Sequence, residues 1–240
     1  MIAKWLKDHF EWVWHAVFTF SLAPAVVLLI RYMQDDLGAN PLAELLHTTG
    51  SCSLNLLTIT LAVTPVRKWA ASAARATHLR FGKRLADWNW LIRLRRQLGL
   101  WCFFYATCHA GIYVALDLGF DWAAGWQEII EKPYLAAGLV SLTLLLPLAA
   151  TSTTRMIRVL GRHWRRLHML TYVVAIMGLL HFWWMQKPGV FAPWPVTVAL
   201  VILLGYRVLI RSGLLTRWEG DDGSESPDRP LKPRQTGDIA

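Results

Sequence analysis

Three histidines lie within stretches of the sequence that are otherwise apolar. His109 stands in the stretch 98–117, and His168 and His181 stand in the stretch 167–185. Ionisable residues inside a lipid bilayer are costly and rare, so they often have a function. A neutral imidazole can relay protons, ligate a metal or a haem iron, or donate a hydrogen bond to a backbone carbonyl. The residue types alone leave these roles open.

Depth along the two helices brings two of the histidines to one level. Both stretches run from a basic loop into the membrane, and a helix rises about 1.5 Å per residue. His109 then lies about 18 Å beyond Gln97, and His181 lies about 22 Å beyond Arg166. Two imidazoles at one depth on neighbouring helices are what axial ligation of a haem iron requires. The spacing therefore favours a haem site between His109 and His181.

His168 is expected at a different place from this pair. It lies only about 3 Å into the membrane by the same rise, so it cannot be the ligand opposite His109. Its 13-residue offset from His181 turns about 140° away from the face of His181 on a straight helix. Either that helix is kinked or bulged, or His168 serves a different group. Arg95 lies at the depth of His168 on the helix of His109, but arginine is not a normal haem ligand. His15 on the first span is a weaker candidate for a partner of His168.

The composition indicates a membrane protein. Of the 240 residues, 55% are apolar and only 17% are charged, with a mean hydropathy of +0.33. Average soluble domains are about 25% charged. The net charge of +9 would fit nucleic acid if the basic residues shared one face, but they cluster between long apolar runs. Membrane topology explains them, and no nucleic-acid partner is expected.

We predict an all-α fold, an integral membrane bundle of six transmembrane helices with both termini cytoplasmic. The basic segments 67–96 and 155–166 hold nine and five Lys or Arg, whereas the intervening segments hold at most one. Basic loops stay in the cytoplasm, so both termini belong there. A spanning helix needs about 20 apolar residues. The predicted spans are 12–31, 45–66, 98–117, 134–151, 167–185 and 190–210.

Two segments outside the spans have their own expectations. The segment from Trp69 to Arg84 mixes apolar and basic residues, which suits an amphipathic helix on anionic lipid or a docking surface. Residues 219–240 are polar, and we expect a disordered cytoplasmic tail after a membrane domain of residues 1–218. No nucleotide-binding glycine motif occurs, so the chain should not oxidise NAD(P)H alone. The three cysteines show no zinc or disulfide spacing.

Motifs in both loops and spans, over about residues 60–185, resemble the MsrQ family of haem-binding membrane subunits of the periplasmic methionine sulfoxide reductase system. The wider resemblance is to the ferric reductase and NADPH oxidase transmembrane domain. The motifs are Thr64-Pro65-Val66-Arg67, Arg95-Arg96-Gln97-Leu98-Gly99-Leu100, Tyr105-Ala106-Thr107-Cys108-His109, Lys132-Pro133-Tyr134, Leu148-Ala149-Ala150-Thr151-Ser152, Leu160-Gly161, Trp164, Leu167-His168 and Leu180-His181.

The resemblance implies an electron-transfer subunit that takes electrons from quinol through haem b to a periplasmic molybdenum-containing methionine sulfoxide reductase, which repairs oxidised proteins. The chain would have no sulfoxide-reducing site of its own. His109, His181 and His168 match the family's haem-linked histidines, with His168 a second or alternative ligand. FMN is implied by the resemblance only. The inner histidine of the larger oxidase domain is replaced here by Arg95.

Other functions remain open on the residues alone. The same histidines could form the relay of a small transporter or proton channel, and the chain could be a non-catalytic anchor. Electrons could also come from a cytosolic flavin reductase instead of quinol. The arginines of 155–166 could hold an FMN phosphate near residues 152–154, although cytoplasmic positive charge explains them without a ligand. Gly111, Ala106 and Gly178 are small enough to admit a flat ring, or they are ordinary helix contacts.

Overall fold

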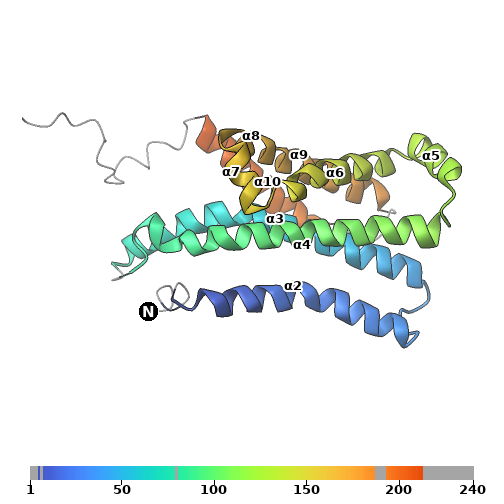
Figure 1. Ribbon diagram of the computed structural model, residues 1–240, viewed down its shortest axis with the longest axis horizontal. Coiled ribbons are helices and arrows are strands. Elements are labelled where there is room, and N and C mark those ends of the chain that lie inside the picture. Colours follow the sequence, from blue (N-terminus) through green and yellow to red (C-terminus); the bar gives the residue numbers. More distant parts are fainter. Residues whose placement is uncertain (1–4, 6–7, 79–80, 187–192, 213–240) are drawn as a thin grey trace, which may run out of the picture. The chain divides into compact units, whose positions relative to one another are not determined.

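The computed structural model describes residues 5, 8–78, 81–186 and 193–212, and every regular element in these ranges is helical (Figure 1). This confirms the all-α prediction. The expected tail of residues 219–240 lies outside the described residues. The elements are α2 (Phe10–Met33), α3 (Pro41–Ala76), η1 (Leu85–Trp88), α4 (Asn89–Ile112), η2 (Tyr113–Asp117), α5 (Trp122–Glu131), α6 (Pro133–Ala150), α7 (Thr154–Leu160), α8 (Arg162–His168), α9 (Leu170–Met185) and α10 (Trp194–Arg211).

In the described part of the chain, five helical segments are long and apolar enough to cross a membrane, as in a multi-pass membrane protein. They are Phe10–Met33, Pro41–Ala76, Leu85–Asp117, Pro133–Ala150 and Arg162–Met185. The apolar part of α10, Trp194–Ile210, is shorter than these. The chain divides into two units, Met1–Leu204 and Gly205–Ala240, and the described residues of the second are helical through Arg211. The remaining description concerns the first unit.

The core of the first unit is built by two helix pairs, α3 with α4 and α6 with α9. Side-chain hydroxyls tie each pair together: Ser53 Oγ donates to Cys102 O at 3.0 Å, and Ser141 Oγ donates to Val174 O at 3.3 Å. Buried apolar side chains fill the space inside. They are Leu54, Leu57, Leu61, Cys102, Leu145, Leu148, Val174, Ala175, Leu200 and Leu203.

The hydroxyl-rich span α3 is stable in an apolar setting because its threonines are satisfied locally. Thr49, Thr58 and Thr60 each donate to the carbonyl four residues earlier in the helix, at 2.7 to 2.8 Å. These bonds remove the cost of burying an unpaired hydroxyl. Polar residues in a span therefore do not argue against its insertion.

The structure extends α3 well beyond the span expected from the sequence. The helix continues through Pro65 to Ala76, so residues 69–76 are helical and belong to α3. The segment is rich in alanine, the best helix former, and Ala71 and Ala74 are buried. The first part of the expected amphipathic segment is thus a continuation of α3, and its contact with lipid or with a partner stays a prediction.

Helix α2 is attached to α4 by a tyrosine hydroxyl. Tyr105 on α4 is fully buried, and its hydroxyl donates to Ser21 O at 2.6 Å and accepts from Ala25 N–H at 3.1 Å. Ser21 and Ala25 lie one helical turn apart, on either side of Pro24. Proline lacks a backbone N–H and loosens the helix around it. The hydroxyl therefore bridges the turn of α2 that the proline weakens.

Substituting Tyr105→Phe tests this attachment. The variant leaves a buried carbonyl and a half-buried N–H without the hydroxyl, which should cost about 1–3 kcal/mol of unfolding free energy. Thermal unfolding of the detergent-solubilised protein should show a lower midpoint. Tyr32→Phe is the control, because the Tyr32 side chain is exposed. Equal midpoints for wild type and Tyr105→Phe would contradict the role assigned to the hydroxyl.

Candidate functional site

The rings of His109 on α4 and His181 on α9 face each other between the two helix pairs. Their centroids are 5.9 Å apart and their planes are inclined at 86°. Nothing links these residues in sequence, since 72 positions separate 109 from 181. The depth arithmetic brought them to one level, and the packing of α3, α4, α6 and α9 brings them into contact.

His109 is held by helix α3. Its Nδ1 lies 2.9 Å from Leu46 O and 3.4 Å from Thr49 Oγ1. The ring packs over Gly50, where an added Cβ would come within 3.2 Å of both Nδ1 and Cε1. Helix α3 thus supplies both a hydrogen-bond acceptor and an open place for the ring.

His181 is held in the same way by helix α6. Its Nδ1 lies 2.7 Å from Tyr134 O, and a Cβ on Gly138 would come within 2.8 Å of that nitrogen. Tyr134 stands in the first turn of α6, just after Pro133 at the helix start. The two histidines therefore share one arrangement: a ring nitrogen on a backbone carbonyl and a glycine beneath the ring.

The carbonyl partners determine the protonation of both imidazoles. A carbonyl oxygen only accepts, so each Nδ1 must carry the proton and donate it. Each Nε2 of a neutral ring then keeps a free lone pair. Within the described part of the chain, neither Nε2 has a hydrogen-bond partner. The pair is prepared as two neutral nitrogen ligands.

The separation of the rings fits one metal atom between them. A metal–imidazole bond is about 2 Å long and a ring nitrogen lies roughly 1 Å from its ring centre, so two such halves add to about 6 Å. No group of three or more His, Cys, Asp or Glu that could hold a metal occurs among the described residues. Two protein ligands suit a metal whose other ligands come from a macrocycle, as in haem.

His168 stands apart from this pair. It ends α8, and the helix is interrupted at Met169 before α9 begins at Leu170. Its Nδ1 lies 3.2 Å from Trp164 O, and its ring stacks on Trp164 with centroids 3.9 Å apart. The sequence left open either a kink in this helix or a different role for His168, and Met169 interrupts the helix between His168 and His181. His15 is exposed, with its ring edge-on to Trp14.

The glycines that pack against the histidine rings are not the two considered from the sequence, Gly111 and Gly178. Nothing lies within 4 Å of a Cβ placed on Gly111, and Gly178 makes only ordinary contacts of 3.6 Å with Leu54 and Ser141. The glycines against the histidines are Gly50 and Gly138. A four-residue spacing from a carbonyl residue to a glycine, Leu46 to Gly50 and Tyr134 to Gly138, is the only sequence signal, and it is too common to be specific.

A polar cluster fixes the chain where α5 leads into α6. Tyr113 Oη donates to Glu128 Oε2 at 2.8 Å, and Lys132 Nζ lies 3.0 Å from the same oxygen. The hydrogen bonds from Lys132 and then Tyr113 lower the pKa of Glu128, and the hydrogen bond with Glu128 raises the pKa of Lys132. Lys132 immediately precedes α6, whose first turn carries the carbonyl that binds His181.

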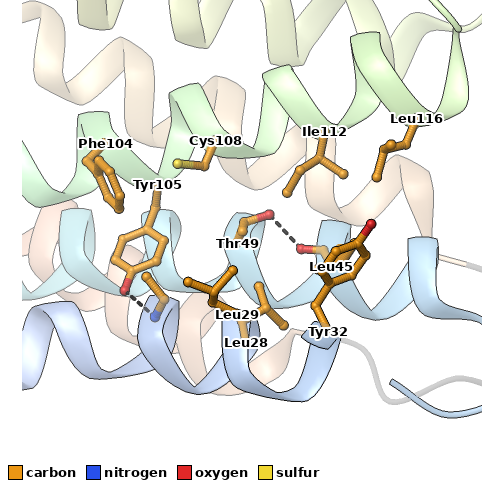
Figure 2. A pocket seen from close by; sticks show the side chains of 11 residues that line it. Leu28, Leu29, Tyr32, Leu45, Thr49, Phe104, Tyr105, Cys108, Ile112 and Leu116 are labelled. Atoms are coloured by element: carbon orange, nitrogen blue, oxygen red, sulfur yellow. Dashed lines mark hydrogen bonds between the residues drawn. The ribbon is translucent and has the colours of Figure 1, made fainter. Parts of the chain in front are cut away.

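An apolar cavity of about 250 Å³ lies between α2, α3 and α4. Figure 2 shows Leu28, Leu29 and Tyr32 of α2 on one side of it, with Thr49 of α3 and Cys108 of α4 opposite. Thr49 is the link to the histidine pair, because its hydroxyl is also 3.4 Å from His109 Nδ1. The cavity and the pair therefore share one wall.

The apolar helices and the histidine pair between them agree with a comparison of the sequence with known protein families. A family model described as the ferric reductase like transmembrane component matches residues 49–179, which is more than half of the chain. That match includes α4 and most of α3 and α9, as well as all of α6. The fold and the pair thus mark a ferric reductase-like transmembrane protein.

Curated relatives narrow this class. Each of the following three relatives carries the name protein-methionine-sulfoxide reductase heme-binding subunit MsrQ. That of Xanthomonas axonopodis pv. citri (strain 306) is 41% identical over 194 residues, 78% of this chain and 82% of the relative. That of Xanthomonas campestris pv. campestris (strain 8004) is 41% identical over 199 residues, covering 80% and 84%. That of Ralstonia nicotianae is 42% identical over 197 residues, covering 80% and 83%. The chain belongs to the MsrQ family.

The cluster at the start of α6 gives a pH-dependent prediction. A lowered pKa of Glu128 stabilises the fold above its ordinary value of 4.5, and this contribution is lost as the pH falls through the folded-state pKa. The pKa of Lys132 is raised in the folded protein, so its contribution to stability is fully present below 10.5 and is lost as the pH rises through the folded-state pKa. Lys132→Ala should therefore lower the thermal midpoint at neutral pH, and the difference from wild type should vanish in acid. A difference that persists at a pH well below the lowered pKa of Glu128, where this carboxyl is protonated in the folded protein, would show that Lys132 does not act through Glu128.

Proposed function

We propose that the chain is a membrane electron-transfer subunit. It would carry electrons from the quinone pool through haem b to a periplasmic molybdenum-containing methionine sulfoxide reductase that repairs oxidised proteins. The observation that supports this most is the His109–His181 pair, with its ring separation of 5.9 Å and both Nδ1 atoms fixed on carbonyls. The names of the relatives, heme-binding subunits of a methionine sulfoxide reductase, agree with it.

In this proposal the chain binds and orients a cofactor and leaves the sulfoxide chemistry to its partner. His109 and His181 would hold the haem iron, and the carbonyls of Leu46 and Tyr134 hold the two rings in the tautomer that this needs. Haem b, when bound, supplies a one-electron carrier. The apolar core of α3, α4, α6, α9 and α10 excludes water, which favours the less charged, reduced state.

The hydrogen bonds argue against the alternative of a proton relay. A relay histidine must pass a proton between its two nitrogens and neighbouring groups that both donate and accept. Here each Nδ1 faces a backbone carbonyl, which accepts a hydrogen bond but has no proton to pass on. The arrangement supports a fixed ligand better than a proton relay for a transporter or channel.

Six spans with both termini cytoplasmic remain our proposal for the topology in the bacterial inner membrane. It treats α10 as the sixth span and residues 1–218 as the membrane domain. The basic segments around η1 and α7 would face the cytoplasm, and α5, with Glu128 and Glu131, would face the periplasm. The histidine pair then lies in the outer half of the membrane, near the proposed periplasmic partner.

Quinol is the proposed electron donor because an apolar cavity adjoins the histidine pair. The cavity between α2, α3 and α4 is lined mostly by aliphatic and aromatic side chains and suits an isoprenoid quinol. Thr49 joins it to His109. A cytosolic flavin reductase is the alternative donor, with FMN near the arginines of 155–166. One arginine of α4, Arg96, reaches that segment, since its Nη1 donates to Thr154 Oγ1 at 3.3 Å.

Variants of the histidines test the haem site. His109→Ala and His181→Ala should each lower bound haem b below about a tenth of wild type, because each removes one axial ligand. The measurement is the oxidised-minus-reduced absorption spectrum of purified protein, scaled to protein content. His168→Ala should weaken cofactor content or electron entry and keep the outer haem, and His163→Ala, an exposed residue of α8, is the control. Loss of all haem in His168→Ala would contradict the assignment of the pair.

A cavity-filling variant tests the quinol route. Leu29→Trp adds bulk to a residue that lines the cavity and should slow the reduction of bound haem by a short-chain quinol about tenfold or more, with unchanged haem content. Val27→Trp is the matched control, since Val27 is also on α2, has a similar exposure and does not line the cavity. Equal reduction rates in the two variants would place the quinol elsewhere.

A further inference from the structure

Two glycines occupy equivalent positions beneath the two histidines. Gly50 follows Leu46 by four residues on α3, and Gly138 follows Tyr134 by four residues on α6. In each case the earlier residue supplies the carbonyl that binds Nδ1, and the glycine lies under the ring. The same device therefore occurs twice, on two helices that contact different histidines.

The helix geometry explains why the later position must be small. Side chains four residues apart lie on one face of a helix, and each Cα–Cβ bond tilts toward the helix N-terminus. A Cβ at the later position therefore stands beside the carbonyl oxygen of the earlier one. At Gly138 it would lie 2.8 Å from His181 Nδ1, and at Gly50 it would lie 3.2 Å from His109 Nδ1. A methyl group there would push the ring away from its carbonyl.

We propose that Gly50 and Gly138 are positioning residues for the two imidazoles. By leaving the carbonyls of Leu46 and Tyr134 accessible, they fix the tautomer, the ring plane and the basicity of His109 and His181. For its effect on haem this inference rests on the proposed function. The inference goes beyond that function, because it assigns control over the orientation and basicity of both imidazoles to two glycines, which have no side chain of their own.

A hydrogen bond from Nδ1–H to a carbonyl makes the opposite nitrogen a stronger electron donor. Stronger donation favours the ferric state, so weakening either bond should make the midpoint potential of bound haem more positive. The ring planes are held nearly perpendicular, at 86°. Perpendicular imidazole planes give ferric haem a highly anisotropic low-spin signal in electron paramagnetic resonance, so a turned ring changes that signal.

Ordinary close packing of helices does not account for these two glycines. Gly178 is a packing glycine, with contacts of 3.6 Å to side chains of α3 and α6. Gly99 and Gly111 on α4 have nothing within 4 Å of an added Cβ. In the described bundle, Gly50 and Gly138 stand out because the atoms that crowd them belong to the imidazole rings. This difference supplies the controls.

The test compares Gly50→Ala and Gly138→Ala with Gly111→Ala and Gly178→Ala. Each purified protein is measured for haem content, midpoint potential and the ferric low-spin resonance signal. We expect a positive shift of potential and a less anisotropic signal in the two former variants, larger in Gly138→Ala because its contact is shorter. The two controls should match wild type in all three measurements. Wild-type values in both Gly50→Ala and Gly138→Ala would overturn the inference.

Two further measurements keep the outcome decisive. If Gly138→Ala does not accumulate in the membrane, Gly50→Ala, with the longer contact, decides the question. Protein with ¹⁵N-labelled histidine, prepared without haem, reports the tautomers directly: Nδ1–H in wild type, and a mixture of tautomers in Gly138→Ala. A wild-type protein that binds no haem would refute the proposed function, while unchanged histidine tautomers in the glycine variants would refute the positioning role.

Discussion

The hydrogen bond from a histidine Nδ1–H to a backbone carbonyl of the neighbouring helix governs the candidate site. It joins α4 to α3 at His109 and α9 to α6 at His181. These are the same helix pairs that form the core, so the bonds that orient the imidazoles also set the register of the bundle. A backbone acceptor cannot change its identity or its charge. The tautomer of each ring is thus fixed by the fold, and the two rings lie in contact with their centroids 5.9 Å apart.

The packed core and the histidine pair lie at different levels along the same helices. Residues such as Leu61, Cys102 and Ala175 are almost completely buried, which indicates tight packing without room for a flat ring at their level. The pair lies further along the same helices, where Gly50 and Gly138 open the space. His168 lies toward the other end, stacked on Trp164 and joined to it by a hydrogen bond. The helices therefore present one matched pair of imidazoles and one isolated histidine.

The helices and the level of the histidine pair could be predicted from the sequence. The hydrogen-bond acceptors, the glycines under the rings and the length of α3 could not, for physical reasons. Hydropathy predicted the five described helices that are long and apolar enough to span, and the sixth expected span corresponds to the shorter α10. The rise of a helix gave the common level of His109 and His181. The acceptors of their hydrogen bonds were not predictable, because every residue has a carbonyl and the register between two helices leaves no trace in one sequence. For the same reason Gly111 and Gly178 looked suitable while Gly50 and Gly138 did not. The length of α3 was missed because basic residues inside a continuing helix resemble a loop.

Helix α4 connects the cavity to the histidine pair, and this limits how independently either can change. Gln97 Nε2 donates to Trp14 O at 3.1 Å and Tyr105 bonds to Ser21 and Ala25, so both attach α2, the far wall of the cavity. One helical turn beyond Tyr105, His109 bonds to α3. A displacement of α2 would therefore move α4 within one helical turn of His109. Helices α6 and α9 contribute no residue to the lining of the cavity. Events in the cavity should therefore reach the pair through His109 rather than through His181.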